Sequence, residues 1–221
     1  MKKFILLPPA LLALASVSLA QIVVTPDSAS ATSTIGGSRT ITEVINGSDL
    51  SGGGTSGDIL SETHDLSTDS AGYFLSGSFS STSTPTFEIT FDLGGTFDID
   101  GVHLWNYDRN NDNPTRALKN FDISFSTDGG TNYGTTYAAG TFSDFAGADN
   151  PRVDNEIAVQ SRFFTSVSDV TDIKIDNIVL QGDNSYIGFS EIRFNAVPEP
   201  SSFALLAGCF GLAWVMLRRR A

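Results

Sequence analysis

Strict alternation of apolar and polar side chains is the feature that most restricts what this chain can fold into. Across residues 87–93 every second side chain is Phe, Ile or Leu, and Glu, Thr and Asp stand between them. The same period of two returns in residues 121–125 and 172–176. Because neighbouring side chains of an extended strand point to opposite faces, this pattern predicts strands with an apolar inner face and a polar outer face.

Turn residues separate these alternating segments. Clusters of Gly, Asp and Asn occur at 94–95, 128–130 and 182–184, and no amphipathic helix of useful length competes with the strand pattern. Many short strands joined by such turns are typical of two antiparallel sheets packed face to face. We therefore expect an all-β, antiparallel β-sandwich, with a flexible Ser- and Thr-rich lead-in over 21–40 and a long loop over 77–86.

The first twenty residues have the composition of a secretory signal peptide. A basic start precedes an apolar region over 4–17, and small residues at 18–20 stand before Gln21. This order predicts removal of residues 1–20 by signal peptidase and export of the mature chain through the inner membrane. No cysteine occurs between 21 and 200. An oxidising compartment would therefore add no disulfide, and folding depends on the core alone.

The other end of the chain carries a second targeting pattern. An apolar run over 203–217 would span about 22 Å as a helix, which is shorter than the roughly 30 Å hydrocarbon core of a bilayer. It predicts a marginal membrane span with the arginines on the cytoplasmic side, and the chain's only contact with a membrane. Cys209 lies inside the run and is interpreted as a small hydrophobic residue. The motif before the run is Pro198, Glu199 and Pro200, and the basic stop after it is Arg218, Arg219 and Arg220.

In this order, residues 196–221 resemble the PEP-CTERM sorting signal of Gram-negative, exopolysaccharide-producing bacteria. The resemblance implies that a membrane protease of the exosortase type recognises the Pro-Glu-Pro motif and releases or transfers the exported protein. It also implies a destination in the cell envelope, at the cell surface or in the extracellular matrix. An ordinary C-terminal membrane anchor is the alternative.

The exported part of the chain is strongly acidic. Residues 21–200 contain 8 basic and 25 acidic residues, a net charge of −17. Such a surface repels nucleic-acid phosphates and anionic lipid headgroups. It suits cations and neutral or cationic glycans, although solubility in a salty medium would explain it as well. About 177 residues are enough for one domain with a single core.

Four stretches of the exported part resemble the discoidin, or coagulation-factor C-type, domain. They are an early turn at 43–49, a central hairpin at 89–94 with 99–106, a strand followed by Ser, Asp and Gly at 117–129, and a closing strand at 187–194. The resemblance implies a galactose-binding-like jelly roll over 41–195, a fold also used by carbohydrate-binding modules. Residues 73–75 stand where the family often has a tryptophan. The apolar spikes and basic loop residues of lipid-binding relatives are missing, so a glycan ligand is favoured over a lipid.

The same resemblance implies one structural calcium ion between the early turn and the closing strand. Carried over to this sequence, its ligands would be Asn46, Asp49 and Glu191. Oxygen donors of this kind suit a hard cation. Strand parity adds a second indication, because Phe189 falls on the wrong face if Ile192 and Phe194 point into the core. We therefore expect a bulge near Ser190, or a Glu191 turned from its expected side. An exposed acid on an edge strand is the alternative.

The loop that follows Trp105 is the best candidate for a ligand site. Sugars are bound by an aromatic face together with planar amide, carboxylate and guanidinium groups, and residues 106–116 contain all of these. Tyr186, on the turn before the closing strand, would complete the rim. The predicted ligand-binding residues are Trp105, Asn106, Tyr107, Asp108, Arg109, Asn110, Arg116 and Tyr186. Ordinary loop residues and a core position for Trp105 are the alternative.

Catalysis has little support in the sequence. The chain has two histidines and no cysteine in its exported part, so neither a common zinc site nor a cysteine nucleophile is indicated. The expected function is therefore a noncatalytic carbohydrate-binding or matrix-associated module, exported and sorted by an exosortase-type system. A structural matrix protein of the same fold without a specific ligand is the alternative, and a polysaccharide lyase or glycosidase is a third interpretation.

Overall fold

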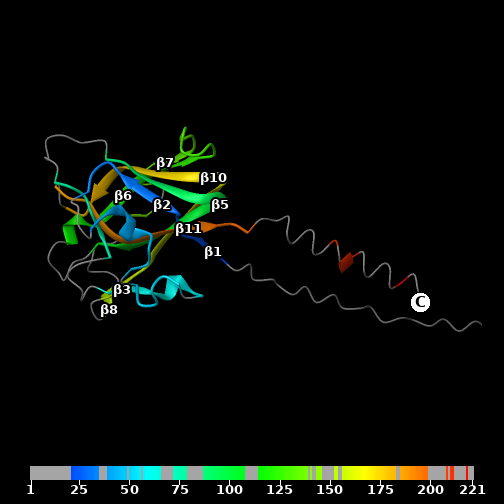
Figure 1. The fold of residues 1–221 in the computed structure, drawn as a ribbon, viewed down its shortest axis with the longest axis horizontal. Coiled ribbons are helices and arrows are strands. Elements are labelled where there is room, and N and C mark those ends of the chain that lie inside the picture. Colours follow the sequence, from blue (N-terminus) through cyan, green and yellow to red (C-terminus); the bar gives the residue numbers. More distant parts are fainter. Residues whose placement is uncertain are drawn as a thin grey trace, which may run out of the picture.

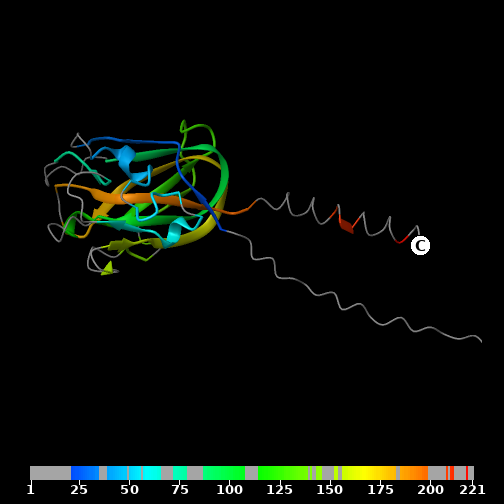
Figure 2. The same ribbon diagram turned by 60° about the horizontal axis from the view of Figure 1, so that its bottom comes forward.

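A computed structural model was analysed (Figures 1 and 2). It describes residues 21–34, 39–48, 50–55, 57–65, 72–78, 87–107, 114–138, 140, 143–145, 152–153, 156–182 and 185–198, together with 208, 210, 211 and 218.

The regular secondary structure of the described domain consists almost entirely of strands. The strands are β1 (Ile22–Val24), β2 (Ser28–Ala31), β3 (Thr63–Asp65), β4 (Phe74–Leu75), β5 (Ile89–Asn106), β6 (Leu118–Ser126), β7 (Thr136–Tyr137), β8 (Arg152–Val153), β9 (Glu156–Ala158), β10 (Gln160–Leu180) and β11 (Gly188–Ala196). Three 3-10 turns lie between them: η1 (Ile41–Val44), η2 (Ile59–Ser61) and η3 (Pro114–Arg116).

A long antiparallel ribbon of β5 and β10 organises the domain. Ile89 of β5 pairs with Ile175 of β10, and the pairing continues to Leu104 opposite Gln160. Register shifts interrupt it where residues 163–172 oppose 92–101, and such irregularities bend a strand. The central hairpin expected from 89–94 and 99–106 is therefore wrong, because both segments run in one direction within a single bent strand.

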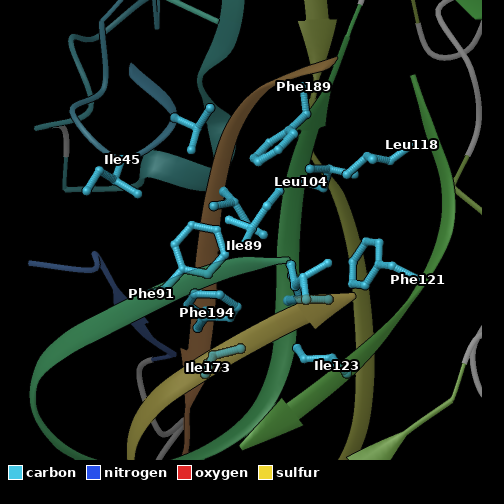
Figure 3. Packing of buried hydrophobic residues seen from close by; sticks show 14 of the residues in the cluster. Ile45, Ile89, Phe91, Leu104, Leu118, Phe121, Ile123, Ile173, Phe189 and Phe194 are labelled. Carbon is cyan, nitrogen blue, oxygen red and sulfur yellow. The ribbon is translucent and has the colours of Figure 1, made fainter. Parts of the chain in front are cut away.

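The bend lets one ribbon contribute to both layers of a sandwich. Beyond β5 and β10 the strand order continues through β11 to β1 on one side and through β6 to β7 on the other, while β2 pairs with the first half of β5. Figure 3 shows the interior, where Phe91 and Ile173 face Leu104 and Phe194. The rings of Phe91 and Phe194 meet edge to face with centroids 5.5 Å apart, and each such buried ring stabilises the fold by roughly 1.5–3 kcal/mol.

The expected flexible lead-in over 21–40 contains two strands instead. β1 pairs with β11, with Ile22 opposite Ala196, and β2 pairs with β5, with Ala29 opposite Phe91. Val24 is buried in the core. The sandwich therefore begins within the segment that follows the predicted signal peptide, and not at residue 41.

Both ends of the described domain lie side by side, because its first and last strands pair with each other (Figure 1). A small second sheet, in the order β3-β9-β8, lies beside the main one. Among the described residues, none of the helices has the length and apolarity needed to cross a bilayer.

The predicted targeting segments lie largely outside the described residues. Pro198 and Arg218 are described, whereas Glu199, Pro200, Arg219, Arg220, residues 1–20 and most of 203–217 are not.

Candidate functional site

The predicted ligand residues that the structure describes lie at or beside strand ends that meet at one end of the sandwich. Phe189 near the start of β11 lies opposite Asn106 at the end of β5, and Gly188 pairs with Leu75 of β4. We call this region, built around Tyr73, Tyr107, Arg116 and Tyr186, the loop end.

Two of the predicted ligand residues are interior residues that hold the loop end together. Trp105 is fully buried, and its indole N–H donates to the carbonyl oxygen of Glu62 over 2.9 Å. The side chain of Asn106 is buried as well: its amide nitrogen donates to the carbonyl oxygen of Leu118 over 2.7 Å, and its Oδ1 accepts the backbone N–H groups of Leu118 and Tyr107. Asn106 thus joins the end of β5 to the start of β6, two strands that do not pair with each other. Neither Trp105 nor Asn106 presents a surface to a ligand.

Tyr107 is buried too, as part of an aromatic cluster. Its ring meets that of Tyr73 edge to face at 5.4 Å and covers Gly188, where an added Cβ would lie 2.6 Å from the ring. The guanidinium of Arg39 lies 5.3 Å from the ring centroid of Tyr73. Among the described residues, the buried hydroxyl of Tyr73 has no hydrogen-bond partner. Tyr73, which sequence reasoning did not select, occupies the region where the resembled family often has a tryptophan.

Arg116 and Tyr186 are the part of the predicted site that the structure brings together at the surface. The guanidinium of Arg116, at the end of η3, stacks over the ring of Tyr186, which precedes β11, with 4.5 Å between the guanidinium carbon and the centroid. Both side chains are half-buried. An aromatic face beside planar guanidinium donors is the combination that binds a sugar. The predicted partners Asp108, Arg109 and Asn110 lie outside the described residues.

The expected bulge in the closing strand is confirmed. The pairing of β11 with β5 shifts between Phe189 and Glu191, which leaves Ser190 as the extra residue. Glu191 is thereby turned into the protein and is fully buried. Its Oε2 accepts the backbone N–H of Gly47 over 3.3 Å, so the closing strand does meet the early turn.

The described residues do not assemble the predicted calcium ligands. Asn46 is exposed, with its Oδ1 accepting the N–H of Ser48 over 2.7 Å and its amide nitrogen donating to Glu43 over 3.0 Å. Asp49 lies outside the described residues. Across the described part of the chain, no group of three or more His, Cys, Asp or Glu side chains is placed to hold a metal ion.

A cation already faces the buried carboxylate. Glu191 Oε1 forms an ion pair with Nη1 of Arg193, which is also buried. Burial raises the pKa of Glu191, and the charge of Arg193 counters that rise. Burial likewise lowers the pKa of Arg193, and Glu191 counters that change. Both shifts have the sign expected when two opposite charges leave water together.

A second region with sugar-binding chemistry lies on the outer face of the sheet formed by β2, β5 and β10. A hollow of about 370 Å³ is lined by residues of these strands and by Tyr133 of the loop after β6. Lys174 lies 5.4 Å from the Tyr133 ring centroid and forms ion pairs with Glu88 at 3.2 Å and Asp176 at 2.9 Å. Sequence reasoning missed this region, because its residues come from four distant segments and read one by one as a solvated strand face.

Comparisons with known proteins support the fold. A scan against protein-family models finds no match, and a search of curated proteins finds none. Among solved structures, the chain is similar to the family 32 carbohydrate-binding module of NanJ from C. perfringens, in complex with galactose, with a TM-score of 0.50 and 16% identity over 79% of this chain and 98% of that one. It is also similar to a variant of chitosan-binding module 1 from a chitosanase/glucanase of Paenibacillus sp. IK-5, with a TM-score of 0.50 and 15% identity over 80% of this chain and 99% of that one. At these identities the likeness is one of fold, and the fold is the antiparallel β-sandwich of carbohydrate-binding modules.

Proposed function

We propose that this chain is an exported, noncatalytic carbohydrate-binding module whose glycan binds at the loop end. The observation that carries the proposal is the half-buried pair of Tyr186 and Arg116, in which planar guanidinium donors lie over an aromatic ring at the surface of the loop end. The fold is consistent with it, since the module of NanJ to which the chain is similar was solved with galactose. The net charge of −17 in the exported part favours a neutral or cationic glycan over an acidic one.

A catalytic role is less well supported than binding. The imidazole rings of His64 and His103 are both buried, and so neither is presented to a substrate at the surface. Turnover on a panel of polysaccharides would be the observation that favours a lyase or a glycosidase instead.

A glycan array followed by titration calorimetry on the full-length protein tests the proposal. Tyr186→Ala removes the ring face, and a loss of about tenfold in affinity is expected, which corresponds to about 1.4 kcal/mol. Arg116→Gln removes the charged donors and should weaken the same glycans.

Tyr133→Ala is the matched control. Tyr133 is also a half-buried tyrosine beside a basic side chain, Lys174, but it lies on the outer sheet face. The control should leave affinity unchanged. If Tyr133→Ala weakens binding and Tyr186→Ala does not, the site is on the sheet face and the loop end is refuted. A blank array would favour a structural matrix protein without a specific ligand.

Delivery is the second half of the proposal. The Pro198-Glu199-Pro200 motif, the apolar run over 203–217 and the terminal arginines support sorting by an exosortase-type protease to the cell envelope, the cell surface or the matrix. Mass spectrometry of the protein recovered from producing cells and their medium tests this. A mature chain that begins at Gln21 and is cut near Pro198 is expected, and recovery of the intact chain from the cytosol would refute it.

A further inference from the structure

The closing strand carries a buried charge pair on the face opposite the main core. Ile192 and Phe194 point into the core between the two layers, so Glu191 and Arg193 share the other face. That face is covered by the early turn, because Gly47 binds Glu191 and Val44 accepts a hydrogen bond from Arg193 Nη1 at 3.4 Å. Glu191 is 0% and Arg193 1% exposed. Neither charge is therefore satisfied by water.

Arg193 is fixed by several neighbours besides Glu191. Its Nη1 donates to the carbonyl oxygen of Ile192 over 2.8 Å, and its Nη2 lies so close to Gly54 that an added Cβ there would be 3.7 Å away. The nearby carboxylate of Glu62 also acts on Arg193 electrostatically. Oε2 of Glu62 accepts the backbone N–H groups of Gly52 and Gly54 over 3.1 and 2.9 Å. The guanidinium thus sits between the early turn, the glycine-rich segment 52–54 and two buried carboxylates.

Calcium and this guanidinium would compete for the same oxygens. A calcium ion needs six to eight oxygen ligands at about 2.3–2.6 Å. Here Glu191 Oε1 and the carbonyl oxygen of Val44 already face Arg193, and Asn46, one of the ligands implied by the resemblance, is engaged within its own turn. The described residues of the early turn and the closing strand therefore do not fit the ion.

We propose that Arg193 takes the place of calcium in this chain: its guanidinium is the built-in cation that joins the closing strand to the early turn. An arginine stays protonated at all physiological pH values and cannot dissociate. The consequence is a domain that folds independently of divalent cations. The exported part has a net charge of −17, which attracts calcium ions to its surface. With Arg193 in place, folding of the domain does not depend on that calcium.

Thermal melting and calorimetry of the full-length protein test the proposal directly. The melting temperature should be the same in EDTA and in millimolar calcium chloride, and calcium titration should release no saturable heat. A rise in melting temperature with calcium, or one saturable site per chain, would overturn the proposal.

Arg193→Ala supplies the complementary result. It leaves Glu191 buried without its cation and opens space beside it, so melting should occur at a lower temperature in EDTA. Added calcium or methylguanidinium should restore part of that loss. The control is Lys174→Ala, which removes another cation with two carboxylate partners, but one on the outer face. Its melting should respond to neither addition.

A double variant guards against failure of Arg193→Ala to fold. Glu191→Gln combined with Arg193→Met removes both charges while keeping similar volumes, and it should melt above either single variant. A double variant that melts no higher than Arg193→Met alone, or an Arg193→Ala protein that melts like the wild type, would show that the pair does not hold the turn.

Discussion

Acid should destabilise this domain through one histidine. His103 lies on β5 and is fully buried. Its Nδ1 is 2.7 Å from the hydroxyl of Ser161, and its Nε2 is 3.2 Å from the side-chain nitrogen of Gln21. Since an amide nitrogen can only donate, Nε2 accepts, and the proton of the neutral ring sits on Nδ1 and points to Ser161. Protonation of Nε2 would break the contact with Gln21.

Burial lowers the pKa of His103 from 6.5 to about 4, and the opposing effects of Asn195 and Asp100 do not offset it. At a pH between these two values the unfolded chain binds a proton at this site and the folded chain does not. The contribution of His103 to the free energy of unfolding is therefore fully present above pH 6.5, and it falls as the pH drops toward 4. Between pH 7.5 and 4.5 the loss from this one group is about 2.5 kcal/mol.

Urea unfolding at a series of pH values measures this loss, and His103→Gln isolates it. Other carboxylates titrate in the same range, but they are common to both proteins. The stability of the wild type should therefore fall by about 2.5 kcal/mol more than that of His103→Gln between pH 7.5 and 4.5. Parallel pH profiles for the two proteins would refute the assigned protonation state, whatever the absolute stability of the variant.

Three further substitutions test the packing around the loop end and the core. Trp105→Phe keeps an aromatic ring but leaves a small cavity and removes the hydrogen bond to Glu62, and a loss of about 1–3 kcal/mol in urea unfolding is expected. Gly188→Ala forces a methyl group against the Tyr107 ring, 2.6 Å away, so it should cost about 1–3 kcal/mol and disturb the near-ultraviolet circular dichroism of the tyrosines. Phe194→Ala removes a ring that joins the two layers and should cost about 3–5 kcal/mol, with an unchanged ligand preference wherever the variant folds.

The period of two was sufficient to predict the sandwich and much of its core. Phe87, Ile89, Phe91 and Leu93 are all buried as the alternation requires. The parity conflict at Phe189 predicted a bulge, because a single strand cannot place an odd-spaced set on one face without an extra residue. These are local arguments, and they succeed because each depends on a few consecutive residues.

The parts that sequence reasoning missed depend on contacts between distant segments. Residues 28–31 are Ser-Ala-Ser-Ala, which has low strand propensity, and the exposed edge of β5 makes them a strand. The side of Trp105 could not be predicted, because residues 101–106 are buried on both faces of the strand. Arg193 reads as an ordinary outward strand residue until the early turn is seen to close over it.

The strand order also places the loop end far from the C-terminal end of β11. β11 begins beside the loop end, with Gly188 next to Leu75, and finishes beside β1, with Ala196 next to Ile22. Nine residues of strand separate the two ends, a distance of roughly 27–30 Å. A chain attached through residues beyond Pro198 would therefore present Arg116 and Tyr186 away from the point of attachment. Since β11 also carries Glu191 and Arg193, the pair that fastens the early turn stiffens the strand that spans this distance. Weakening that pair should therefore loosen the early turn. The loop end should keep its position, because the pairing of β11 with β5 holds it.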